Sequence, residues 1–240
     1  MIEVRKLIKR FGLKYVLRGL DFEVEQGEFV ALIGPNGAGK TTFLRILSSL
    51  SRPSMGEVML AGYRLPHQAA AVRSQLGVLS HQPLLYGDLS AEENLTFFGR
   101  MYAVSDLETR IGEVLELVGL KKRRRDLVRT FSRGMQQRLA IGRSVIHDPQ
   151  ILLLDEPYTG LDQDASSMLD DVLKAVTAEG RTVVMTSHDL ARAADLASRF
   201  DILSRGVIAA SALHADIPPD GLLAFYRRTI NQEEEPALVS

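Results

Sequence analysis

The stretch GPNGAGKT, residues 34–41, fits the pattern G-x-x-x-x-G-K-[ST] over its full length. An apolar run, residues 29–33, precedes it, and apolar residues at helical spacing follow it. The glycines let backbone N–H groups surround a phosphate, Lys40 adds a positive charge, and the Thr41 hydroxyl is a ligand for Mg²⁺. We therefore predict a strand, a loop and a helix that bind a nucleotide through Gly34, Pro35, Asn36, Gly37, Ala38, Gly39, Lys40, Thr41 and Thr42. The alternative is a glycine-rich turn that binds nothing.

The rest of the hydrophobic pattern predicts an α/β fold. Residues 1–33 alternate apolar and polar side chains as strands do, and residues 201–210 resemble a hairpin that turns near Arg205. Two apolar runs, residues 151–154 and 183–186, flank a helix-patterned stretch, which is the alternation of a buried parallel sheet. We predict a P-loop NTPase parallel-sheet core, an N-terminal antiparallel β portion and an inserted helical subdomain.

The same pattern suggests the domain organisation. Residues 1–82 and 151–220 are assigned to the core, made of the β portion and the part that carries the phosphate loop, and residues 83–150, where helical periodicity dominates, to the helical subdomain. Residues 221–240 are assigned to a C-terminal tail. The acidic composition after Arg228 predicts that this part of the tail has no fixed structure.

Composition excludes several classes of protein. The 240 residues are 45% hydrophobic, enough for one α/β domain with its own core. A net charge of −1 provides no overall positive field, so we expect no nucleic-acid partner. The lack of cysteine excludes disulfides and thiolate metal sites. Neither a secretory signal nor an apolar run long enough to cross a bilayer is present, which predicts a cytoplasmic location.

Two acids and a histidine follow predicted strands. Asp155 and Glu156 end the run at residues 151–154, and His188 follows the run at residues 183–186. Ligands in open α/β sheets lie beyond the carboxyl ends of the strands, so these side chains belong at one edge. We predict that Asp155 holds Mg²⁺, that Glu156 is the general base for water attacking a terminal phosphate, and that His188 senses that phosphate. The alternatives are a helix cap with a first-turn acid, and a structural histidine.

Together these motifs resemble the nucleotide-binding subunit of ATP-binding-cassette (ABC) proteins, from residue 2 to about residue 210. The resemblance implies an aromatic residue that stacks on adenine, and Phe11 occupies the corresponding place. It implies a glutamine loop, with Gln82, that touches Mg²⁺ and the membrane partner. It also implies a D-loop in which Asp162 reaches the other protomer. The alternatives are a core phenylalanine, an ordinary polar loop and a simple turn.

The stretch FSRGM, residues 131–135, corresponds to the signature that reads Leu-Ser-Gly-Gly-Gln in most members of that family. It stands directly ahead of a helical pattern, and helix starts favour anions. The resemblance implies that Ser132 and Gly134 grip the γ-phosphate of ATP held by the opposite subunit. Arg133 and Met135 depart from the family pattern. We expect these two residues to adjust the ATPase activity without abolishing it. The alternative is a capped core helix that binds no ligand.

The resemblance implies an ATPase, with ATP and Mg²⁺ as cofactors, that energises a transporter. Two such chains, expected to form a homodimer, close head to tail over ATP and move a separate transmembrane permease at the inner face of the cell membrane. Residues 84–102 would form part of the groove that receives the permease. The sequence of the signature stretch is most similar to that of export-type members, including the haem exporters of cytochrome c maturation.

Other functions stay open at this point. A soluble ABC ATPase for cofactor assembly, such as iron–sulfur cluster biogenesis, carries the same motifs. A P-loop kinase is a third class, although Glu156 beside Asp155 favours water as the phosphate acceptor. The basic run at residues 121–125 is either a partner-facing or membrane-facing patch or, as surface charge runs usually are, a solvated helix end.

Overall fold

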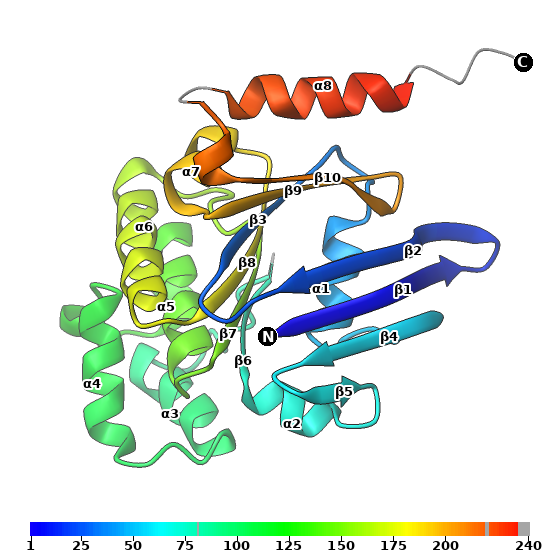
Figure 1. Ribbon diagram of the computed structural model, residues 1–240. Coiled ribbons are helices and arrows are strands. Elements are labelled where there is room, and N and C mark those ends of the chain that lie inside the picture. Colours follow the sequence, from blue (N-terminus) through cyan, green and yellow to red (C-terminus); the bar gives the residue numbers. More distant parts are fainter. Residues whose placement is uncertain (81, 219–220, 235–240) are drawn as a thin grey trace, which may run out of the picture.

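The computed structural model describes residues 1–80, 82–218 and 221–234 (Figure 1). Within them, a six-stranded sheet has the order β10-β9-β3-β8-β7-β6. Its strands are β3 (Phe29–Ile33), β6 (Leu76–Leu79), β7 (Ile151–Asp155), β8 (Thr182–Ser187), β9 (Arg199–Ser204) and β10 (Val207–Leu213). Neighbours pair in parallel except β9 and β10, which form the predicted hairpin. All residues of β3, β7 and β8 are buried, as expected of strands covered on both faces. The parallel core is confirmed.

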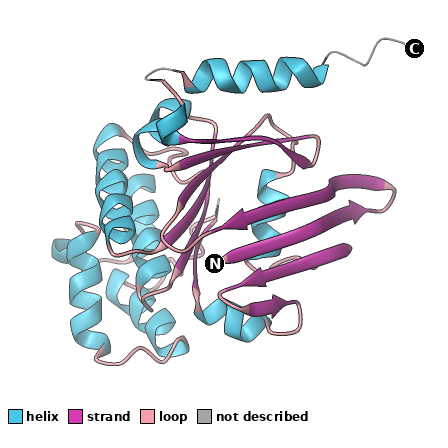
Figure 2. Cartoon of the chain, viewed as in Figure 1, coloured by secondary structure: helices cyan, strands magenta, loops and turns pink. Residues whose placement is uncertain are grey.

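A second, antiparallel sheet comes mainly from the N-terminal part of the chain (Figure 2). Its order is β2-β1-β4-β5, from β1 (Ile2–Phe11), β2 (Lys14–Val24), β4 (Met55–Leu60) and β5 (Tyr63–Leu65). The helix α1 (Lys40–Leu47) packs between the sheets, because Phe43 shares one core cluster with Leu32 of β3 and Leu20 of β2. The antiparallel portion is confirmed. The short elements β4, β5, α2 (Ala69–Ser74) and β6 extend it and the core beyond what the pattern predicted.

Helices cover the other face of the central sheet (Figure 1). Residues 83–150 contain α3 (Ala91–Met101), α4 (Leu107–Leu117), α5 (Arg133–Val145) and the 3₁₀ turns η1 (Lys121–Arg123) and η2 (Val128–Thr130). Later in the chain, α6 (Gln163–Ala178) and α7 (Leu190–Leu196) join the same layer. One core cluster unites Leu139 of α5 and Leu169 of α6 with Leu154 of β7. The helical region is confirmed.

The helix α8 (Leu222–Glu234) follows the 3₁₀ turn η3 (His214–Asp216) and corrects the expectation for residues after Arg228. Helix α8 continues through that position instead of ending in an irregular tail. Leu222 and Thr229 are buried two turns apart, so one face of the helix packs on the domain. The polar and acidic residues 231–234 obscured the helical pattern of this segment in the sequence. Residues 235–240, the rest of the predicted tail, lie outside the described residues.

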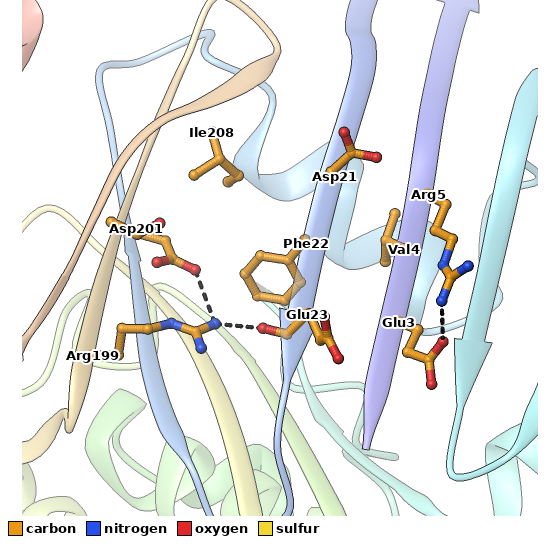
Figure 3. Close-up of a pocket in the computed structure, with 10 residues that line it drawn as sticks. Glu3, Val4, Arg5, Asp21, Phe22, Glu23, Arg199, Asp201 and Ile208 are labelled. Atoms are coloured by element: carbon orange, nitrogen blue, oxygen red, sulfur yellow. Dashed lines mark hydrogen bonds and ion pairs between the residues drawn. The ribbon is translucent and has the colours of Figure 1, made fainter.

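Arg199 joins the two sheets (Figure 3). Its guanidinium donates to both carboxylate oxygens of Glu28 at 2.8 and 3.0 Å, to Asp201 at 3.2 Å and to the Glu23 carbonyl of β2 at 2.6 Å. Asp201 is 2% exposed; burial raises the pKa of its carboxyl, and the charge of Arg199 opposes that rise. Arg199, Asp201 and Glu23 line a cavity of about 570 Å³ that shares no lining residue with the cleft of the phosphate loop.

We expect Arg199→Ala to lower the free energy of unfolding by about 3 kcal/mol, because Glu28 and Asp201 lose a shared, largely buried cation. Without Arg199 the pKa of Asp201 rises further above its ordinary value of 3.8, so ionising this group costs stability as pH rises through the folded pKa. The loss of unfolding free energy in Arg199→Ala should therefore be larger at pH 7 than at pH 5. Denaturant unfolding at both pH values measures it.

The control for this prediction is Arg5→Ala, which removes only the exposed pair with Glu3 and should change stability little. If Arg199→Ala lost the same free energy of unfolding at the two pH values, or if the two variants lost the same amount, a buried role for Arg199 would be contradicted.

Candidate active site

The phosphate loop joins β3 to α1, and two of its glycines stand where a side chain would not fit. A Cβ on Gly34 would lie 2.1 Å from the carbonyl oxygen of Leu203 in β9. Gly39 precedes α1 with a φ of 114°, in the left-handed region that favours glycine. The loop therefore lies directly against β9 and leads into the free N–H groups that begin α1.

Lys40 is buried in this loop. Its Nζ donates to the carbonyl oxygens of Gly34 at 2.6 Å and Pro35 at 3.3 Å. Burial lowers the pKa of Lys40, and the charges of Glu156 and Asp155 oppose that change. The hydrogen-bond acceptors are neutral carbonyls, and a phosphate oxygen is a stronger partner for an ammonium group. Lys40 is thus held where an incoming phosphate can replace those carbonyls.

Asp155 ends β7 beside the first turn of α1. Its Oδ1 accepts hydrogen bonds from Thr41 Oγ1 at 3.3 Å and from Thr186 Oγ1 at 2.8 Å. No cluster of three or more His, Cys, Asp or Glu suited to a metal occurs in the part of the chain that the structure describes. Mg²⁺ at phosphate sites typically takes one or two protein oxygens and completes its coordination from phosphate and water. A hydroxyl and a carboxylate that already touch fit that ion.

Glu156 and His188 meet at the edge of the sheet, where β7 and β8 end. The Glu156 carboxylate makes a short hydrogen bond with Nδ1 of His188. Glu156 has a φ of 52°, a left-handed conformation that few non-glycine residues adopt, and its N–H donates to Thr186 Oγ1 at 3.0 Å. The structure therefore pairs the predicted base with the predicted sensor.

A cleft of about 850 Å³ brings most of these residues together, and its volume is typical of a small-molecule site. Four basic side chains, on three separate segments, suit it to a polyphosphate. The lining residues are Lys14, Tyr15, Val16, Arg18, Pro35, Asn36, Gly37, Ala38, Gly39, Lys40, Thr41, Thr42, Glu156, His188 and Arg205.

Phe11 is not one of the lining residues. It is 57% exposed at the end of β1, with the Lys9 ammonium 4.8 Å from its ring centroid. Tyr15, at the start of β2, is the aromatic residue that lines the cleft. The strand pairing is irregular between Lys9 and Arg10, so alternation along the sequence gave no signal for Tyr15. Contact of Phe11 with adenine stays a prediction.

Gln82 follows β6 and is exposed, and its carbonyl accepts a hydrogen bond from Ser80 Oγ at 2.7 Å. The next residue, Pro83, lines a cavity of about 260 Å³ together with Glu156. The glutamine segment thus lies beside the predicted base. Contact of Gln82 itself with a metal stays a prediction.

Ser132 and Gly134 lie at the start of α5. Ser132 Oγ caps the helix by accepting the Met135 N–H at 3.2 Å, and Asp162 caps α6 through the Ala165 N–H at 2.8 Å. A Cβ on Gly134 would lie 3.9 Å from Asp162 Oδ2, so the signature and the D-loop are neighbours. Ser132, Gly134 and Asp162 do not line the cleft of the phosphate loop. The two predicted phosphate-binding helix starts do not meet within one chain.

Arg133, the third residue of the signature stretch, is close to Gly160. A Cβ on Gly160 would be 2.5 Å from the guanidinium carbon of Arg133. Beside it, Gln137 Nε2 donates to the Pro157 carbonyl at 3.0 Å. The departure from the family pattern is therefore accommodated by a contact with the D-loop of the same chain.

The sequence matches the family model described as ABC transporter over residues 17–159. This range contains the phosphate loop, the signature stretch and the two acids whose positions are given above. The chain belongs to the ABC transporter family. It is an ATP-binding, ATP-hydrolysing subunit of the kind that serves these transporters.

Curated ABC relatives and solved ABC structures resemble most of the chain. The linearmycin resistance ATP-binding protein LnrL of Bacillus subtilis is 34% identical over 219 residues, which are 90% of this chain and 70% of LnrL. The Nod factor export ATP-binding protein I of Cupriavidus pinatubonensis is 38% identical over 208 residues, which are 86% of this chain and 64% of that protein. The chain therefore spans about two thirds of the length of these relatives.

Among solved structures, an ATP-binding subunit of an ABC transporter has a TM-score of 0.89 and 31% identity, covering 96% of this chain and 99% of its own. A dimeric post-hydrolysis state of an ATP-binding cassette, bound to ADP and Pi, has a TM-score of 0.82 and 28% identity, covering 89% of this chain and 99% of its own. The predicted fold class is confirmed by these two structures.

Carboxylates surround the basic run of this ABC subunit. Arg124 pairs with Glu92 at 2.5 Å and with Glu108 at 3.1 Å, and Lys121 pairs with Glu116 at 2.5 Å. Much of the positive charge is balanced locally, which favours the solvated helix end over a patch for anionic partners. Among the helices that the structure describes, none is both long and apolar enough to cross a bilayer.

Proposed function

We propose that two copies of this chain close head to tail over ATP and drive a separate permease in an export-type ABC transporter. The observation that carries the proposal is that Ser132 and Gly134 lie outside the cleft that contains Lys40. A second copy placed head to tail supplies them, with Asp162 beside them, to complete that cleft. The dimeric state of the solved cassette with ADP and Pi supports this arrangement.

In the proposed reaction, the phosphate loop and Lys40 bind the phosphates of ATP. Glu156 accepts a proton from the attacking water, whose oxygen bonds to the γ-phosphorus as the bond to the ADP oxygen breaks. His188 holds Glu156 through Nδ1, which leaves Nε2 for a phosphate oxygen. Thr41 and Asp155, with Gln82 as a further ligand, would hold Mg²⁺, which would supply positive charge against the phosphates.

The outer face of α3 supports a permease contact. Phe97 and Met101 are exposed there and line a shallow cavity of about 470 Å³ with Glu93, Thr96 and Arg100. The Tyr86 ring meets Phe97 edge-on, with centroids 5.0 Å apart. Exposed apolar side chains gathered in this way mark interaction sites. A cytoplasmic segment of the permease is the occupant we propose, which places the chain at the inner face of the membrane.

The names of two relatives, a linearmycin resistance protein and a Nod factor export protein, support an export-type assignment. Haem export stays a prediction from the sequence of the signature stretch. Co-purification in mild detergent separates the transporter from the soluble alternative. Recovery of a polytopic membrane subunit supports the proposal, and recovery of a soluble assembly scaffold supports the iron–sulfur alternative.

We expect Ser132→Ala to weaken ATP-driven dimerisation by at least about tenfold, because a hydroxyl bonded to a charged phosphate contributes about 1.5–3 kcal/mol. Sedimentation with ATP, in a Glu156→Gln background, measures this. Ser90→Ala is the matched control: Ser90 also caps a helix, α3, but lies outside the proposed dimer contact. Dimerisation that is unchanged in Ser132→Ala, or equally weakened in Ser90→Ala, would contradict the head-to-tail arrangement.

A further inference from the structure

We propose that Thr186 is a positioning residue for ATP hydrolysis, whose hydroxyl holds Asp155 and Glu156 in their reactive arrangement. The proposal rests on the general-base role given to Glu156. Thr186 stands on β8 directly opposite Asp155 of β7 in the parallel register, and it is fully buried. It precedes His188 by two residues, and nothing in the sequence motif assigns it a task.

One hydroxyl serves both acids. Thr186 Oγ1 donates to Asp155 Oδ1 at 2.8 Å and accepts the backbone N–H of Glu156 at 3.0 Å. The Leu154 carbonyl, at 3.5 Å, is a longer alternative acceptor for the same proton. A hydroxyl has one proton to donate and two lone pairs to accept with, so these two bonds use it in both capacities.

The first bond fixes the orientation of Asp155. Two hydroxyls, those of Thr41 and Thr186, share its Oδ1, and the Thr186 bond is the shorter of the two. Without Thr186 the carboxylate keeps the 3.3 Å bond from Thr41 and gains freedom to rotate. The hydroxyl therefore determines which carboxylate oxygen faces the ligand.

The second bond fixes the backbone of Glu156. A left-handed conformation in a glutamate persists only where its surroundings hold it, and here the Thr186 hydroxyl accepts the N–H of that residue. The side chain that follows from this turn contacts His188. Loss of the bond leaves a backbone donor without its partner, so the turn relaxes and moves the carboxylate away from the attacking water.

The test compares two threonines of the same strand. Thr182 is also fully buried on β8, and its hydroxyl accepts the Gly27 N–H at 3.0 Å, but it lies at the opposite end of the strand from the cleft. Thr186→Val and Thr182→Val each remove one buried hydroxyl without changing the shape of the side chain much. Both should lower the melting temperature of the full chain by similar amounts.

The expected difference is in turnover. Thr186→Val should lower kcat by about 100-fold, the range set by a displaced general base, with the KM for ATP within about threefold of wild type. Thr182→Val should leave both constants unchanged. Thr186→Ser, which keeps the hydroxyl, should recover turnover to within about fivefold of wild type, whereas Thr186→Ala, which differs from it only by that hydroxyl, should not.

Three results would overturn the proposal: wild-type kcat in Thr186→Val, an equal fall of kcat in Thr182→Val, or equal turnover of the serine and alanine variants. The serine and alanine pair decides the matter even if the valine variant does not fold. Addition of Thr186→Val to Glu156→Gln should lower turnover little further, because both changes act on the same base. Activity retained by Glu156→Gln would refute the base assignment itself, so the two failures are distinguishable.

Discussion

Replacement of Glu156 by glutamine is expected to lower the steady-state rate of ATP hydrolysis by about 10²–10⁴-fold, the usual contribution of a positioned general base. Glutamine has the same shape but accepts no proton from water at neutral pH. The contacts proposed to bind ATP come from the phosphate loop and are left intact, so the affinity for ATP should stay within a few-fold of wild type. Release of free phosphate, measured without an added acceptor, gives the rate.

Under the proposed head-to-tail mechanism, the same variant should accumulate as an ATP-bound dimer, because closure over ATP would proceed and the hydrolysis that reopens the dimer would be blocked. Glu25→Gln is the matched control, since Glu25 is an exposed glutamate in the turn after β2 and does not line the cleft. Wild-type phosphate release from the Glu156 variant would show that another group activates the water. Formation of ADP by the wild-type protein only in the presence of a small-molecule acceptor, with the phosphoryl group on that acceptor and no free phosphate released, would favour a kinase.

The second large effect is expected for Lys40→Ala, which should weaken ATP binding by about 100-fold. A hydrogen bond to a charged group contributes about 1.5–3 kcal/mol, and this ammonium is held within the loop before the ligand arrives. A fluorescent ATP analogue titrated against the variant measures the change. Lys174→Ala removes an exposed lysine of α6 and should bind the analogue as wild type does.

Folding should be little affected by this loss, since Lys40 bonds neutral carbonyls of its own loop. A melting temperature close to that of wild type would show this. If Lys40→Ala binds the analogue with unchanged affinity, the loop is a structural turn, as the alternative interpretation of the sequence holds.

The parts of the site that the sequence predicted are those in which the candidate residues are contiguous or directly follow the carboxyl end of an apolar strand, as His188 does. The glycines and Lys40 of the loop, and Asp155 with Glu156, follow directly from the ends of apolar strands, so local spacing was enough. Thr186 was missed as a partner of both acids because its role depends on how β8 lies against β7. Sequence spacing within either strand carries no information on that register.

Other differences between the predicted and the observed structure have similar physical reasons. The strand β5 has only three residues, and β4 is half exposed. β4 depends on pairing with β1, far away in the sequence, and β5 in turn depends on pairing with β4. Tyr15 reaches the cleft through an irregular hairpin, which period-two alternation does not anticipate. In each case the deciding contact joins segments far apart in the chain or follows a break in the regular pattern.

The central place of β3 has a consequence for synthesis on the ribosome. Both edges of this strand pair with strands made much later, β8 and β9, and Gly34 rests on the Leu203 carbonyl. A nascent polypeptide that has not yet released residues 182–204 lacks both neighbours, although its GPNGAGKT stretch was translated long before. Nucleotide capture during translation must therefore wait until nearly the whole domain has emerged from the exit tunnel.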